Sequence, residues 1–163
     1  MSYAEHRRII DVDSHVIELD DFLSNAATPE DRALLPAMSD QRDLAMSAEG
    51  LSRGKELFAK RQEDPRVMAK FEASLMQARG NGWSRLGAFD PHERSHALDL
   101  MGFERQFILP TFSFHQIGHL QDNAALTAGA RALNRAMGAF CAHDERLSAI
   151  GYLPLRLGPE VAG

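Results

Sequence analysis

Short apolar runs alternate with helical patterns along this chain, and this order constrains the fold more than any other feature. Strands are expected at residues 8–12, 103–110 and 147–153, where β-branched and large apolar side chains suit a pleated, buried strand. Amphipathic helices are expected between them, at residues 91–101 and 122–142. Strands that alternate with helices favour a parallel sheet. We therefore expect an α/β fold.

The connection between the first two expected strands is far longer than an ordinary loop between a strand and a helix. It forms an insertion at residues 19–89, at the carboxyl end of the first strand, where α/β proteins bind ligands. Within it we expect helices that begin at Pro29 and Pro65, because a capping residue precedes each proline. Residues 37–63 are expected to be mainly loop, with some helix around residues 54–61. Such an insertion is typical of a lid or a subunit contact.

The chain length sets a limit on the architecture. With 163 residues, the chain suits a single domain over residues 1–163. Three parallel strands make a small sheet for such long helices, and a closed (β/α)8 barrel needs about 250 residues. We expect the amino-terminal portion, about three strands, of a larger TIM-type barrel. The alternative is a small open α/β domain that is complete as it stands.

Composition excludes several classes of partner. The net charge of −5 argues against a nucleic acid held by its phosphates. No apolar stretch approaches the ~20 residues of a membrane helix, and no signal-peptide pattern precedes the first strand. The single cysteine, Cys141, allows no intrachain disulfide, so we expect a cytoplasmic protein. Cys141 lies in an apolar helical pattern and is expected to be a small buried hydrophobe.

Acidic and histidine side chains gather where the first expected strand ends. Asp13 and His15 are two residues apart, and such residues point to the same side of an extended chain. Carboxylate oxygen and imidazole nitrogen together suit zinc, iron or manganese. The pair is therefore a candidate for part of a metal site, with Asp11 and Glu18 flanking it. Asp11 is expected to orient the pair by hydrogen bonding, and a solvated carboxylate is the alternative. The alternative is a polar turn in which Asp13 bonds its own backbone.

Three further residues are candidates for the surroundings of this site. Arg85, in the insertion, presents a planar fork that suits a substrate carboxylate, although a solvated surface arginine is the alternative. His115 and His119 are four residues apart, like the histidines of a His-Glu-x-x-His zinc motif. The glutamate of that motif is absent and Gly118 intervenes. We expect both histidines in a loop after the second strand, near the rim of the site.

Three blocks occur in order along the chain, at residues 10–18 (IDVDSHVIE), 90–111 (beginning DPHER and ending LPT) and 134–155. With these blocks the chain resembles the amino-terminal part of the amidohydrolase-related family typified by aminocarboxymuconate semialdehyde decarboxylase. The resemblance implies a (β/α)8 barrel with one divalent metal, zinc before manganese or iron, at the carboxyl ends of its strands. It also implies a hydrolase or a non-oxidative decarboxylase of small carboxylic acids, many derived from aromatic compounds.

The family's first-strand His-x-His motif falls on Asp13 and His15, so an acid stands in the first position here. Family members complete the site with a histidine from a middle strand and an aspartate from the last strand. Neither region is among the three expected strands, and a catalytic zinc needs three protein ligands. We therefore expect this chain to be inactive alone. The other hypothesis is a non-catalytic fragment or partner domain, associating with itself or another chain through an open sheet edge or the insertion.

Overall fold

The computed structural model describes residues 3–37, 48–77 and 82–159, so part of the loop expected at 37–63 lies outside the described residues. Its strands are β1 (Ile10–Val16), β2 (Arg105–Pro110) and β3 (Leu147–Ala149). They form one parallel sheet in the order β1-β2-β3. The expected α/β class with a parallel sheet is confirmed.

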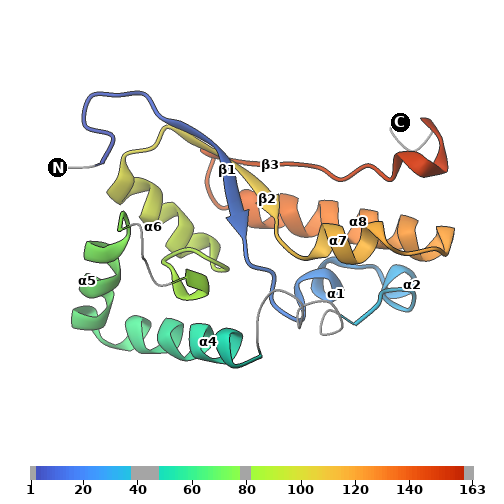
Figure 1. Ribbon diagram of the computed structural model, residues 1–163, viewed down its shortest axis with the longest axis horizontal. Helices are drawn as coiled ribbons and strands as arrows, with labels where there is room; N and C mark the ends of the chain where they lie inside the picture. The colour runs from blue at the N-terminus through green and yellow to red at the C-terminus, as the bar shows by residue number, and fades with distance from the viewer. Residues whose placement is uncertain (1–2, 38–47, 78–81, 160–163) are drawn as a thin grey trace.

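The described helices lie on one side of this sheet (Figure 1). None of them is long and apolar enough to cross a membrane. They are α1 (Phe22–Ala26), α2 (Pro29–Arg32), α4 (Ala48–Glu63), α5 (Pro65–Ser74), α6 (Pro91–Met101), α7 (Ser113–Gly118) and α8 (Asn123–Cys141), with the 3₁₀ turns η1 (Gly82–Ser84) and η2 (Leu155–Leu157).

Local capping chemistry places three of these helices where the sequence predicts them. The side chains of Thr28, Asp64 and Asp90 each accept a backbone N–H of the first turn, and proline follows each of them. Asp122 caps α8 in the same way. Gly102 ends α6 with a positive φ of 71°, which glycine adopts without strain. The expected helix starts are confirmed.

The predicted end of the first strand is wrong. β1 continues past Asp13 to Val16, because the pairing with β2 shifts register between Asp11 and Ser14 and then resumes. This irregularity has the character of a β-bulge, in which one strand holds extra residues. After the bulge, Ser14 and Val16 point into the protein and are buried.

Three other boundaries differ from the sequence prediction. α4 forms a 16-residue helix that includes the helical stretch expected at residues 54–61 but begins earlier, where loop was expected, and it buries Leu51 and Arg61. α7 occupies the segment after β2 that was expected to be a polar loop, and it buries Ile117 completely. β3 ends at Ala149 instead of continuing to residue 153. In α4 and α7, burial against distant parts of the chain accompanies helices that local polarity alone does not favour.

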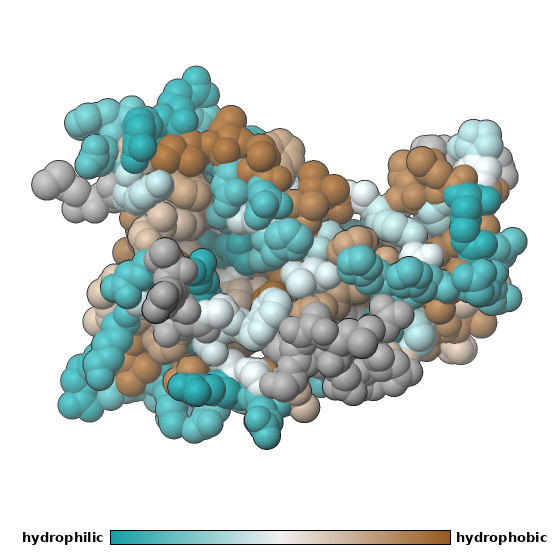
Figure 2. All heavy atoms as spheres, viewed as in Figure 1, coloured by the Kyte–Doolittle hydropathy of each residue, from teal (hydrophilic) through white to brown (hydrophobic). Residues whose placement is uncertain are grey.

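The two faces of the sheet have different surroundings. On the helix side, Val16 and Ile108 are fully buried in a core with Leu98 of α6 and Leu133 of α8. On the other side, Ile10 and Val12 are 50% and 68% exposed, although their β-branched pattern predicted a buried strand. Figure 2 shows apolar side chains at this margin of the molecule. Parallel sheets are normally covered on both faces, so this uncovered face is unusual.

The outer edge of β1, the edge that faces away from β2, is partly occupied by the insertion and by α6. The carbonyl oxygen of His15 accepts a hydrogen bond from Arg94 Nη2 at 2.6 Å. The backbone N–H of Ile17 donates to the carbonyl of Ala88 at 2.7 Å. These bonds take backbone groups that a further strand would need. Only the part of the edge before the bulge, at Ile10–Val12, is left without such cover among the described residues.

A buried ion pair joins the second half of the insertion to α6. Arg61 of α4 donates to Glu93 of α6 through Nε and Nη2, both at 2.6 Å. The side chain of Arg61 is 0% exposed and that of Glu93 is 5% exposed. Glu93 also accepts bonds from Gln62 and from the backbone of Gly87. The Glu93 carboxylate therefore holds α4 against α6.

The first half of the insertion is tied to α8. Asp31 of α2 accepts hydrogen bonds from Arg131 at 2.6 Å and from Arg135 at 2.7 Å. The Asp31 side chain is buried, while both arginines are partly exposed. Hydrogen bonds from the two arginines lower the pKa of Asp31 to about 2. The insertion therefore packs on two different helices of the α/β unit.

Candidate functional site

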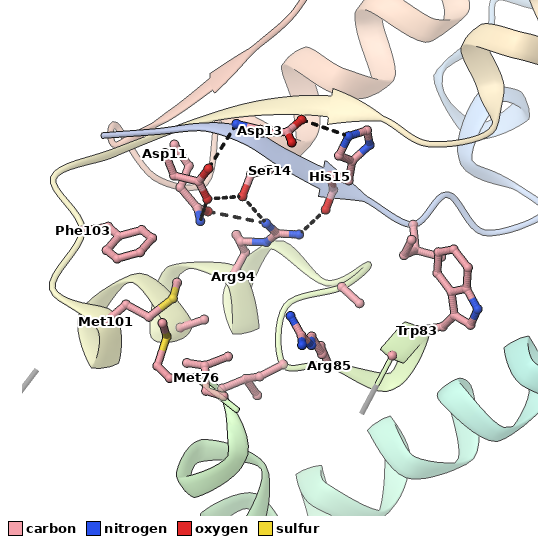
Figure 3. Close-up of a pocket in the computed structure, with 17 residues that line it drawn as sticks. Asp11, Asp13, Ser14, His15, Met76, Trp83, Arg85, Arg94, Met101 and Phe103 are labelled. Atoms are coloured by element: carbon pink, nitrogen blue, oxygen red, sulfur yellow. Dashed lines mark hydrogen bonds and ion pairs between the residues drawn. The ribbon is translucent and has the colours of Figure 1, made fainter. Parts of the chain in front are cut away.

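Asp13 and His15 lie side by side near the carboxyl end of β1. His15 Nε2 is 3.6 Å from Asp13 Oδ1, and the side chains are 43% and 88% exposed. Figure 3 shows both on the side of β1 opposite to Asp11 and Arg94. This arrangement agrees with the same-side placement predicted from their spacing, and the pair belongs to the uncovered face of the sheet. A distance of 3.6 Å is too long for a hydrogen bond.

The other nitrogen of the His15 ring faces β2. His15 Nδ1 lies 3.4 Å from the hydroxyl oxygen of Thr111, the first residue after β2. The same hydroxyl donates to the carbonyl oxygen of Val16 at 2.6 Å. Each ring nitrogen of His15 therefore has a polar neighbour, Asp13 beside Nε2 and Thr111 beside Nδ1. Sequence reasoning did not select Thr111, because its proximity to His15 depends on the register between the two strands.

Glu18, expected to flank the metal pair, is completely buried. Its carboxylate accepts hydrogen bonds from the backbone N–H groups of Thr111, Phe112 and Ser113, at 3.0 to 3.1 Å. These donors form the turn that leads from β2 into α7. Glu18 thus fastens the end of β1 to the end of β2, and its oxygens are directed at the backbone instead of a ligand.

Asp11 stabilises the bulge in β1. Its carboxylate accepts the backbone N–H of Asp13 at 3.1 Å and the Ser14 hydroxyl at 2.8 Å. Gln106 of β2 donates to the same carboxylate at 3.0 Å. Asp11 was expected to orient the metal pair by hydrogen bonding, and the structure shows that it holds the backbone of Asp13.

Arg94 is a buried residue of this region that sequence reasoning missed. Besides His15, its guanidinium donates to the carbonyl of Gly87 at 2.7 Å and to the Ser14 hydroxyl at 3.3 Å. Burial lowers the pKa of Arg94 to about 10, and the negative charge of Asp11 opposes this shift, so Arg94 is charged at neutral pH. The signal was an arginine within the stripe of α6 that also carries Leu98 and Met101.

A cavity of about 580 Å³ lies beside β1, between the strand, α6 and the insertion (Figure 3). This volume is in the range of sites for small molecules. Arg85 is at its wall and donates to the carbonyl of Gln77 at 3.2 Å. The polar lining is Asp11, Asp13, Ser14, His15, Arg85, Arg94 and Gln106, and the apolar lining includes Leu75, Met76, Leu86, Met101 and Phe103.

His115 lies on α7 and His119 directly follows the last residue of that helix, so the expected loop placement is wrong for His115 only. The backbone N–H of His119 donates to the carbonyl of His115, which is a helical bond that completes the last turn. Their rings are stacked with centroids 6.2 Å apart, and both residues are exposed. Neither is among the residues that line the cavity.

The described residues contain no group of three or more histidine, cysteine, aspartate or glutamate side chains that could hold a metal ion. The distance between the Asp13 and His15 side chains nevertheless fits two ligands of a metal ion. Two ligand atoms that each lie about 2.0–2.1 Å from a tetrahedral zinc are roughly 3.4 Å apart. The separation of 3.6 Å in this pair is close to that value. The pair is thus compatible with half of a metal site.

The fold and this pair define the chain as an α/β protein with a parallel sheet and a carboxylate–imidazole pair at a strand end. No family model, curated protein or solved structure matches the chain. The amidohydrolase resemblance therefore rests on the sequence blocks alone.

Proposed function

We propose that this chain is the amino-terminal portion of a metal-dependent amidohydrolase-type (β/α)8 barrel, in which Asp13 and His15 are two ligands of one divalent metal. The observation that carries the proposal is the 3.6 Å separation of Asp13 Oδ1 and His15 Nε2, at the carboxyl end of a parallel strand. Zinc is the first candidate, and manganese or iron are alternatives, because all three accept oxygen and nitrogen ligands.

The strand order and the position of the helices favour a barrel and not a doubly wound sheet. The strands follow in the order β1-β2-β3, and α6 and α8 lie on the same side of the sheet. A doubly wound sheet has helices on both faces, whereas a barrel keeps its helices outside and its other face inside. In a barrel the uncovered face would be the interior. Apolar Ile10 and Val12 would then pack in the barrel core, and Asp13 and His15 would lie near its carboxyl-end mouth.

The chemistry would follow from a metal held at this mouth. When bound, such a metal activates water for hydrolysis or polarises a carboxylate or carbonyl for cleavage of a carbon–carbon bond. Asp13 would supply a negative charge and His15 a neutral nitrogen ligand. The cavity that Arg85 lines is on the helix side of β1, whereas the Asp13 and His15 side chains are on the opposite face, so a substrate would reach this metal from the barrel interior and not from that cavity. With two ligands instead of three, this chain alone would be inactive.

The test is zinc binding by isothermal titration calorimetry on the purified chain, with Asp13→Asn and His15→Gln as variants. Control variants are His6→Gln and Glu145→Gln, which remove an exposed imidazole and an exposed carboxylate elsewhere. We expect weak binding that each site variant reduces at least tenfold and that neither control changes. Equal binding by all five proteins, or none by the parent chain, would overturn the metal assignment.

The uncovered sheet face favours a second candidate function, that of a non-catalytic domain that associates with a partner. Large apolar side chains are exposed on this face, Ile10 at 50% and Val12 at 68%. Extended exposed apolar patches mark interaction surfaces. Sedimentation equilibrium of the parent and of Val12→Lys distinguishes the cases. Self-association that Val12→Lys abolishes, together with the absence of metal binding, would favour this candidate.

A further inference from the structure

The hydroxyl of Thr111 has a fixed role in its hydrogen bonds. A threonine hydroxyl carries one proton and two lone pairs. The carbonyl oxygen of Val16 can only accept, and it lies 2.6 Å from Thr111 Oγ1, so the hydroxyl proton is directed there. Toward His15 Nδ1, at 3.4 Å, the same oxygen can therefore only accept.

We propose that Thr111 is a positioning residue that fixes the tautomer of His15. In neutral His15 the proton is on Nδ1, where it is donated to Thr111, and Nε2 keeps its lone pair. The tautomer of a histidine is set by the hydrogen bond that the other ring nitrogen makes. A histidine side chain free in water prefers the opposite tautomer, with the proton on Nε2. The proposed state therefore requires the protein environment.

Glu18 holds Thr111 in the position that this role needs. The backbone N–H of Thr111 donates to Glu18 at 3.0 Å, and the next two backbone N–H groups donate to the same carboxylate. Glu18, which accepts all three bonds, is completely buried. Thr111 is thus held twice, through its side chain to Val16, the last residue of β1, and through its backbone to Glu18, two residues further along the chain. Glu18 acts on His15 only through Thr111.

The proposed tautomer also accounts for the geometry of the Asp13–His15 pair. With the proton on Nδ1, Nε2 cannot donate to Asp13, and two acceptors face one another at 3.6 Å. Such a pair is favourable when a proton or a metal cation lies between them. Histidines that bind metals almost always donate their other N–H to an oxygen acceptor. This last step rests on the proposed metal function, whereas the tautomer itself does not.

The test is two-bond ¹H–¹⁵N correlation NMR of the metal-free chain, labelled with ¹⁵N-histidine, at a pH where free histidine is neutral. The His15 signals are assigned from their absence in His15→Gln. We expect the parent chain to show a protonated Nδ1 and an unprotonated Nε2. Thr111→Val removes the acceptor at nearly constant volume and should shift His15 toward the Nε2-protonated form. Thr111→Ser keeps the hydroxyl and should restore the parent pattern.

Thr127→Val is the matched control, because the Thr127 hydroxyl also donates to a backbone carbonyl, that of Asn123, in an exposed hydrogen bond on α8. The full amide spectrum of each variant verifies that it is folded. A protonated Nε2 in the parent chain, or a Thr111→Val spectrum in which His15 is unchanged, overturns the proposal. Zinc affinity is a second readout, with a loss of about 10–100-fold expected in Thr111→Val. If no variant binds zinc and the tautomer is still as proposed, only the metal function fails.

Discussion

Removal of Arg61 tests whether one buried ion pair holds the insertion to the α/β unit. Arg61→Met keeps an unbranched apolar side chain and removes the guanidinium that makes two 2.6 Å bonds to Glu93. It also removes a bond to the Ser84 carbonyl and a contact over the Phe71 ring at 4.7 Å. The Glu93 carboxylate, 5% exposed, is then left without its cation.

The expected loss in the free energy of unfolding depends on the hydrogen bonds that Glu93 retains. Breaking a buried pair by removing one partner costs about 3–5 kcal/mol, because the remaining charge is buried and uncompensated. Glu93 keeps bonds from Gln62 and from the backbone of Gly87, so we expect the lower end, about 3 kcal/mol. With a urea m-value of about 2 kcal/mol/M, the unfolding midpoint falls by roughly 1.5 M. The double variant Arg61→Met/Glu93→Met should be less destabilised than Arg61→Met alone, because no unpaired charge remains.

The assay is urea unfolding followed by circular dichroism, with hydrogen exchange to locate the loss of protection. Arg66→Met is the matched control, since Arg66 pairs with Asp64 but its side chain is 89% exposed. We expect Arg66→Met to lower the free energy of unfolding by less than about 1 kcal/mol. A midpoint shift for Arg61→Met no larger than that of Arg66→Met would refute the reasoning. Exchange should increase mainly in α4 and α5, which the pair connects to α6.

Two predictions concern titrating groups. The pKa of Asp31 is lowered to about 2, so its stabilising effect is complete above the unfolded value near 4 and is lost as the pH falls toward 2. Because both partner arginines are partly exposed, we expect this effect to be about 1–2 kcal/mol, and Asp31→Asn should flatten the thermal stability profile between pH 4 and 2. Burial raises the pKa of Cys141 to about 11, so a thiol reagent at pH 8 should modify the native chain far more slowly than the urea-unfolded chain. Equal rates in the two states would contradict the burial of this thiol.

Features that depend on neighbouring residues were predictable from the sequence. Proline after a capping Thr28, Asp64 or Asp90 specified three helix starts, because the cap needs only the next few backbone N–H groups. The proximity of Asp13 and His15 followed from the two-residue period of an extended chain. Cys141 is buried, as its position in an apolar stripe predicted.

Features that depend on distant residues were not predictable. The backbone N–H groups of Phe112 and Ser113, at the start of α7, donate to Glu18, more than 90 positions earlier in the chain, in a segment that reads as polar loop. The role of Thr111 requires the β1–β2 register, which is altered by the bulge after Asp11. The β-branched pattern at Ile10 predicts a strand, but it does not say which face of the sheet other elements cover.

The bonds on the outer edge of β1 have a consequence for how a barrel would close. Arg94 and Ala88 already occupy the His15 carbonyl and the Ile17 N–H, so a last strand could pair with β1 only along Ile10–Val12. The stagger between first and last strands defines the shear of a barrel, which in turn sets its strand tilt and its diameter. In the proposed barrel, α6 and the end of the insertion would therefore restrict which residues of β1 the last strand can pair with, and they would thereby fix its register.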